Sequence, residues 1–121
     1  MTQKDLFLRA AAAMSVGDID HIAEWFTEDF RLHDPGLPNW PTGYEGARRM
    51  CQTLLDLVPG ARVEVLDMVE EGDRVGVRWL FSGVAEGKPV HLSAVAIYRF
   101  VDGRIAEDWG IGFKSEWPPT A

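Results

Sequence analysis

Very short turns in the second half of the chain restrict its possible folds more than any other feature of the sequence. Four segments are rich in Val, Ile, Trp, Tyr and Phe, the residues that favour β-strands: 61–70, 74–85, 89–101 and 104–115. Only turn sequences separate them: Glu71-Gly72-Asp73, Glu86-Gly87-Lys88 and Asp102-Gly103. Because links this short cannot carry a crossover, consecutive strands must be antiparallel neighbours. The second half is therefore predicted to be a four-stranded meander.

The first half of the chain has the apolar periodicity of helices. Thr2, followed by Asp5, has the spacing of a capping box at the start of a first helix, which Gly17 ends. After Asp18 as N-cap, the apolar spacing predicts a second, shorter helix that ends near Phe26. A third helix is predicted over residues 44–58, with Pro59-Gly60 as its stop.

The segment between the second and third helices is expected to be a short strand, 29–34, and a loop, 35–43, that contains three prolines and two glycines. With 46% hydrophobic and 26% charged residues, the composition is that of a globular protein. We therefore expect one domain over residues 1–121. Its predicted fold is α+β, with three N-terminal helices packed on a curved, mostly antiparallel β-sheet.

The charge balance argues against polyanionic partners. The chain has 19 acidic and 12 basic residues and a formal net charge of −7. A phosphate backbone or an anionic membrane surface would be repelled, so neither nucleic acid nor a membrane is expected as a partner.

Cysteine use and the opening segment favour a cytoplasmic protein. Cys51, the single cysteine, cannot form an internal disulfide and lies in the third predicted helix. Residues 1–14 include Lys4, Asp5 and Arg9, which interrupt the apolar stretch that a secretory signal needs. No apolar run approaches the roughly 20 residues of a membrane span.

Motifs for metals, phosphates and acyl-serine chemistry do not occur. The sequence has no H-E-x-x-H, no paired cysteines, no phosphate-binding glycine loop and no G-x-S-x-G. We therefore expect neither a metal site nor a cofactor.

Two segments resemble signatures of the SnoaL-like polyketide cyclases, a family within the nuclear-transport-factor-2-like superfamily. The first is His33-Asp34-Pro35, then a Pro/Gly loop and Gly43-Tyr44-Glu45-Gly46. The second is Ile97-Tyr98-Arg99-Phe100-x-Asp102-Gly103-Arg104-Ile105-x-Glu107-x-Trp109. The resemblance runs from about Leu6 to Phe113. It implies a cone in which helices and a concave sheet enclose one apolar pocket. Members of the superfamily include aldol cyclases, steroid isomerases, epoxide hydrolases and proteins without catalysis.

The resemblance implies an acid–base aspartate in the last strand, where the family usually has Gly-Lys/Arg-Ile-x-Glu-His-Trp-Asp. Here Asp108 stands at the place of the histidine and Gly110 at that of the aspartate. Since strand side chains alternate, both positions share one face, so a carboxylate still points to the pocket, displaced by roughly 6–7 Å. Asp108 is thus the candidate base. Arg78 is expected either to polarise a substrate oxygen or to pair with Asp108 as a structural ion pair.

Further candidates surround the expected pocket. The resemblance places His33 at the pocket mouth, where it could share the proton transfer; alternatively it caps the proline-rich loop. Trp40 could close over a flat apolar ligand, or serve as a dimer contact or loop anchor, and Tyr44 could donate a hydrogen bond to the ligand. Leu92 and Ala94, with Gly110, are expected to line the pocket.

Two tryptophans suggest self-association. Trp79, opposite in face to Arg78, and Trp109, opposite to Asp108, are expected on the outer surface of the sheet. Two exposed aromatics there would favour a homodimer through the outer sheet face.

Three functions remain compatible with these patterns. The first is a cofactor-free enzyme that moves a proton within a small hydrophobic carbonyl compound, as a polyketide cyclase or isomerase does. A close variant activates water as an epoxide hydrolase, although Leu80 and Ser82 stand about where the Arg-x-Asp pair of such hydrolases would be. The second is a non-catalytic binding module for a small hydrophobic molecule, and the third is a structural dimer module with a filled interior.

Overall fold

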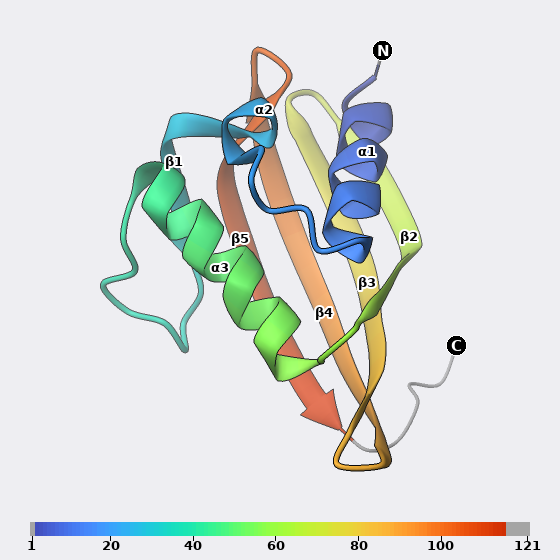
Figure 1. Cartoon of the computed structure of the whole chain (residues 1–121). Coiled ribbons are helices and arrows are strands. Elements are labelled where there is room, and N and C mark those ends of the chain that lie inside the picture. Colours follow the sequence, from blue (N-terminus) through green and yellow to red (C-terminus); the bar gives the residue numbers. More distant parts are fainter. Residues whose placement is uncertain (1, 116–121) are drawn as a thin grey trace.

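The computed structural model describes residues 2–115, and within them three helices and five strands form one α+β unit (Figure 1). The elements follow the order α1 (Gln3–Ser15), α2 (Ile22–Trp25), β1 (Phe26–His33), α3 (Gly43–Leu57), β2 (Arg62–Glu71), β3 (Arg74–Ala85), β4 (Lys88–Val101) and β5 (Arg104–Ser115). The strands form one sheet in the order β1-β5-β4-β3-β2.

The predicted meander is present, with boundaries within one residue of those expected. Strands β2 to β5 are consecutive antiparallel neighbours. The turn between β4 and β5 is Asp102-Gly103, whose φ angles are 51° and 79°. Positive φ at both central residues is the signature of a type I′ hairpin turn, which matches the twist of the strands it joins. Local turn chemistry therefore sets the register of this half.

The short strand expected between the second and third helices is present as β1, but it starts three residues earlier than expected, and the three helices are not all N-terminal to the sheet. Strand β1 lies between α2 and α3, begins at Phe26 and pairs in parallel with β5, with a register shift between Phe26 and Arg31. The second helix is only four residues long, and its N-cap is His21 rather than Asp18. By pairing with β5, β1 covers what would otherwise be an exposed strand edge, and its residues Phe26 and Phe30 are buried in the core.

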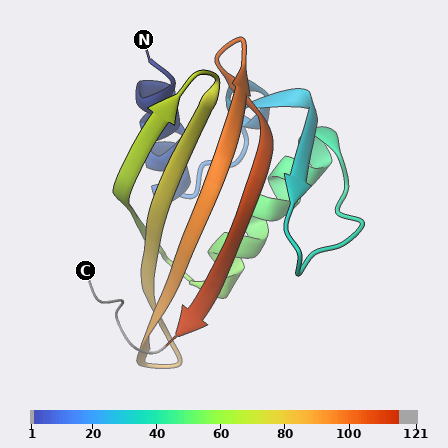
Figure 2. The same cartoon turned by 180° about the vertical axis from the view of Figure 1, so that it is seen from behind.

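All three helices cover one face of the sheet. Helix α1 packs against β2 and β3, whereas α3 packs against β1. No helix of residues 2–115 lies on the opposite face of the sheet (Figure 2). The core therefore forms between the helices and the inner face, where the ring of Phe7 in α1 lies 4.7 Å from those of both Trp79 and Tyr98, measured between centroids.

The prediction that Trp79 lies on the outer surface is wrong. Its side chain is only 7% exposed, and its Nε1 donates a 2.9 Å hydrogen bond to the hydroxyl oxygen of Tyr98. Alternation along β3 puts the apolar residues Val75, Val77, Trp79 and Phe81 in the core. Trp109 lies on the outer face, where its ring stacks on His33 and contacts the guanidinium of Arg74.

Among residues 2–115, no helix combines the length and the apolar character that a membrane span requires.

Candidate functional site

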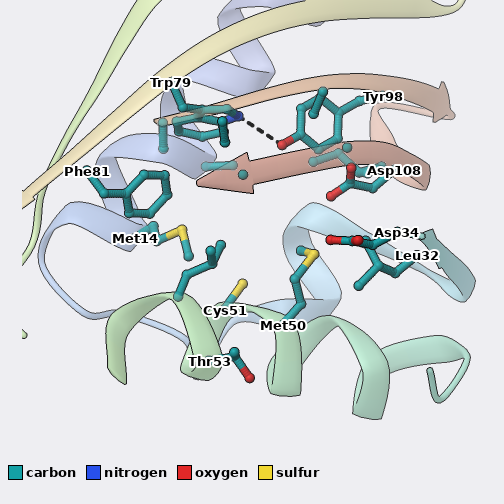
Figure 3. A pocket seen from close by; sticks show the side chains of 18 of the residues that line it. Met14, Leu32, Asp34, Met50, Cys51, Thr53, Trp79, Phe81, Tyr98 and Asp108 are labelled. Atoms are coloured by element: carbon teal, nitrogen blue, oxygen red, sulfur yellow. Dashed lines mark hydrogen bonds between the residues drawn. The ribbon is translucent and has the colours of Figure 1, made fainter. Parts of the chain in front are cut away.

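A cavity of about 440 Å³ lies between the helices and the inner face of the sheet. Side chains from all three helices and from β1, β3, β4 and β5 line it, and most of them are apolar (Figure 3). We call this space the cavity. Its volume and its mostly apolar lining are typical of a binding site for a small organic molecule.

Asp108 is the buried carboxyl group of the cavity. It projects from β5, is 5% exposed, and its Oδ1 accepts no hydrogen bond from any residue that the structure describes. Burial, and secondly the negative charge of Asp34, raise the pKa of Asp108 to about 7. An acid with this pKa exists in both protonation states near neutral pH, as a general acid or base requires.

Gly110 leaves space for that carboxyl group. It lies two residues further along β5, on the same face, and also lines the cavity. A Cβ atom at this position would lie 3.0 Å from Asp108 Oδ1 and 3.0 Å from the Cβ of Ala96. Any larger residue would therefore displace the Asp108 carboxyl group or the neighbouring strand.

Besides Asp108, two buried groups that line the cavity, the hydroxyl of Tyr98 and the thiol of Cys51, are neutral near pH 7. Burial, then the charge of Asp108, raises the pKa of the Tyr98 hydroxyl well above its usual value. The same two causes, partly opposed by Arg48, raise the pKa of the Cys51 thiol to about 12. Tyr98 is also the cross-strand partner of Asp108, and both side chains line the cavity.

Several residues expected around the ligand line the cavity. Leu92, Ala94 and Gly110 contribute to its floor, and Trp40 reaches it from the proline-rich loop. The Trp40 indole Nε1 donates a 3.0 Å hydrogen bond to the carbonyl oxygen of Gly46, which anchors the loop to the start of α3. Tyr44 does not line the cavity, because it projects from the first turn of α3 and is 40% exposed.

Arg78 does not reach the cavity, contrary to both roles expected for it. Its Nε and Nη2 donate hydrogen bonds of 2.9 Å and 2.6 Å to Oδ2 of Asp67 in β2. This pair lies on the outer face, since the neighbouring Trp79 points inward. Arg78 therefore neither neutralises Asp108 nor faces a ligand in the cavity.

His33 also lies outside the cavity. Its Nε2 is 2.7 Å from Oε2 of Glu107, and its ring stacks on Trp109 with centroids 5.0 Å apart. Burial raises the pKa of Glu107, but hydrogen bonds from Arg99 and His33 outweigh this and hold it below its usual value. The expectation that His33 shares proton transfer with Asp108 does not fit this placement.

A second hollow of about 530 Å³ lies beside the cavity, and His33 lines it together with Trp109 and the proline-rich loop. Asp34 lines both spaces. Strand alternation explains the difference, because adjacent residues point to opposite faces and Leu32 and Asp34 therefore share the inner side. Asp34 is the site residue that the sequence interpretation missed, although it is the middle residue of His33-Asp34-Pro35.

Within residues 2–115, no three His, Cys, Asp or Glu side chains are grouped so that they could hold a metal ion. The site is described by its carboxyl groups, its neutral hydrogen-bonding groups and its apolar walls.

The fold is shared with known proteins. Residues 7–108 match the SnoaL-like domain family. A candidate polyketide cyclase from Bacillus cereus is 30% identical, with a TM-score of 0.77 over 88% of this chain and 71% of that chain. IdmH from Streptomyces antibioticus is 26% identical, with a TM-score of 0.78 over 93% and 92% of the two chains. TsrD from Streptomyces laurentii is 25% identical, with a TM-score of 0.74 over 90% and 86%.

Among functionally curated proteins, none matches the chain. The family match covers most of the chain, and the similar structures share the curved five-stranded sheet with its covering helices. The protein therefore belongs to the SnoaL-like domain family of the nuclear-transport-factor-2-like superfamily.

Proposed function

We propose that the protein binds a small hydrophobic carbonyl compound and moves a proton within it, with Asp108 as the acid–base group. The observation that carries this proposal is a buried carboxyl group, with an unpartnered oxygen and a pKa raised to about 7, in an apolar cavity. Burial of such a group costs free energy, and function is a common reason why a protein keeps it. Membership of a family whose similar structures include IdmH, described as a candidate polyketide cyclase, supports the same chemistry.

The proposed step balances without a cofactor. The Asp108 carboxylate removes a proton from the carbon beside the carbonyl group, which leaves an enolate and a protonated Asp108. Return of the proton to another carbon completes an isomerisation. Attack of the enolate carbon on a second carbonyl group, with the proton delivered to the new alkoxide, completes an aldol cyclisation.

The hydroxyl group of Tyr98, a neutral hydrogen-bond donor, takes the role that was expected of Arg78 and His33. The Tyr98 hydroxyl oxygen accepts the hydrogen bond of Trp79, so its own hydrogen can be donated to the substrate oxygen. Tyr98 is paired with Asp108 across β4 and β5, and both side chains line the cavity, which supports a role for Tyr98 as the donor. A hydrogen bond donated in a dry site to developing negative charge is worth more than the same bond in water.

Solvent exchange tests the proposal before the natural substrate is known. Hydrophobic ketones with acidic C–H groups would be incubated with the protein in D₂O, and loss of the C–H signal would be followed by proton NMR. We expect Asp108→Asn to slow this exchange by about 100-fold or more with ligand affinity retained. Arg78→Ala, on the outer face, serves as the matched control and should leave the rate unchanged. Equal exchange rates for Asp108→Asn and the unsubstituted protein would refute the assignment.

A non-catalytic binding module is the second candidate function. Two observations favour it: Gly110 stands where the resemblance places an aspartate, and no Lys, Arg or His within residues 2–115 lines the cavity. A ligand that binds in the cavity without any exchange catalysed by the unsubstituted protein would support this alternative.

We also propose a homodimer through the outer sheet face. Apolar side chains on neighbouring strands β4 and β5 are exposed there: Val95 by 58%, Ile97 by 46%, Ile111 by 51% and Phe113 by 70%. A contiguous exposed apolar surface of this kind is typical of a protein interface. Most residues that line the cavity lie on the opposite, helix-covered face of the sheet, so we expect the dimer to leave the cavity accessible to ligand.

A further inference from the structure

Two carboxyl groups reach the cavity from neighbouring strands. Asp108 belongs to β5, and Asp34 directly follows β1. The parallel register pairs Leu32 with Asp108 and His33 with Trp109. The next residue after each of these two paired segments is Asp34 on the β1 side and Gly110 on the β5 side. Figure 3 shows the carboxyl groups of Asp34 and Asp108 on the same side of the cavity.

We propose that Asp34 and Asp108 act as a pair on one ligand, with Asp108 carrying the transferable proton, Asp34 as its positioning residue, and Gly110 leaving room for the Asp108 carboxyl group. The proposal deepens the proton transfer described above and rests on it for the role of Asp108. The pairing itself can be measured without a substrate.

The surroundings make Asp34 the charge to which Asp108 responds. The other titratable groups that face the cavity are Asp18, Cys51 and Tyr98, and no basic side chain lines it. The Cys51 thiol is neutral near pH 7, because its pKa is raised to about 12. The Tyr98 hydroxyl is neutral as well, because its pKa is raised well above its usual value. The negative charge of Asp34 is the second cause, after burial, that raises the pKa of Asp108. Two nearby carboxyl groups in a dry site hold a proton more tightly than one does.

Local backbone geometry holds Asp34 in place. Its Oδ1 accepts a 2.8 Å hydrogen bond from the backbone N–H of Gly36, two residues later in the chain. This turn keeps the side chain at the boundary between the cavity and the second hollow. One carboxylate oxygen is thus committed to the loop, and the group is oriented before any ligand enters.

Gly110 has a specific role in this arrangement. A Cβ atom there would come within 3.0 Å of Asp108 Oδ1, so a side chain would displace the carboxyl group that the pair needs. The second carboxyl group is that of Asp34, which directly follows β1, and Gly110 leaves the Asp108 carboxyl group room to keep its position.

The test is a carbon-13 NMR titration of the side-chain carboxyl group of Asp108. Asp34→Asn should lower the pKa of Asp108 by about 1 unit, because it removes a neighbouring negative charge. Asp18→Asn is the matched control: it removes a carboxylate that lines the same cavity but does not contribute to the shift of Asp108. A pKa of Asp108 that moves equally in both variants, or in neither, would overturn the pairing.

A second variant protects the test against misfolding. Asp34→Ser removes the charge but keeps an oxygen that can accept the hydrogen bond from Gly36. It should lower the pKa of Asp108 as much as Asp34→Asn does. An unchanged pKa in a folded Asp34→Ser variant would refute the proposal.

The exchange assay separates this inference from the proposed function. If the pair acts in proton transfer, the pH at which exchange reaches half its maximum should fall in Asp34→Asn by the same amount as the pKa of Asp108. A shifted pKa with no exchange in the unsubstituted protein would support the pairing and contradict the proposed function. Exchange that requires Asp108 but keeps its pH profile in Asp34→Asn would contradict the pairing alone.

Discussion

Replacing Asp108 with Asn should change the way in which the stability of the protein depends on pH. Burial and Asp34 raise the pKa of Asp108 from 3.8 to about 7 in the folded state. The folded protein therefore binds this proton more tightly than the unfolded chain does. The resulting stabilisation is fully present below the unfolded pKa and is lost as the pH rises through the folded pKa. Asn carries no such proton, so the variant lacks this dependence.

The size of the effect follows from the difference between the two pKa values. A difference of about 3 units corresponds to about 4 kcal/mol over the whole titration. When the pH rises from about 5 to about 9, the linkage relation predicts that the free energy of unfolding of the unsubstituted protein falls by roughly 2.5 kcal/mol relative to that of Asp108→Asn. The side chain is only 5% exposed, so solvent screening reduces this figure little.

Urea unfolding of both proteins across this pH range would measure the effect. The free energy of unfolding of Asp108→Asn should rise relative to that of the unsubstituted protein as the pH increases. Asp29→Asn, the same substitution at an exposed position of β1, controls for removal of a carboxylate in general. The contrary result is that the two free energies of unfolding differ by the same amount at every pH. That result would refute the argument that Asp108 is buried and unpaired.

Two other substitutions test the packing and the assembly. Tyr98→Phe should lower the free energy of unfolding by about 1–3 kcal/mol, because the buried Nε1 of Trp79 loses its hydrogen-bond acceptor. Urea unfolding measures this, with Tyr44→Phe at an exposed position as the control. A loss of stability no larger than that of the control would contradict the prediction. Phe113→Asp should convert the proposed dimer to a monomer in light scattering, whereas Val16→Asp at the end of α1 should not; a chain that is monomeric without substitution would rule the dimer out.

Much of the fold could be predicted because its signals are local. The Asp102-Gly103 turn and the alternating strands on both sides of it define a hairpin within about ten residues, and the structure has that hairpin. The capping box of Thr2 and Asp5 is likewise present at the start of α1. The parallel pairing of β1 with β5 was not predicted, because it joins segments that are far apart in the sequence.

The site was harder to predict because alternation separates two faces without saying which is buried. The sequence places Arg78 and Trp79 on opposite faces, but we expected the wrong one inside. The apolar residues at the alternate positions Val75, Val77 and Phe81 were the available signal that Trp79 shares the buried face. The same ambiguity affected His33 and Asp34, of which only Asp34 lines the cavity.

The sequence by itself determined the family, the meander and the face shared by Asp108 and Gly110, since these depend on residues close together in the chain. Only the tertiary structure decided that Asp34 and Asp108 line the same cavity, that Arg78 and His33 face away from it, and that the Asp108 carboxyl group is buried. The reason is that proton affinity in a protein depends on which distant segments exclude solvent from a group and which charges they bring to it.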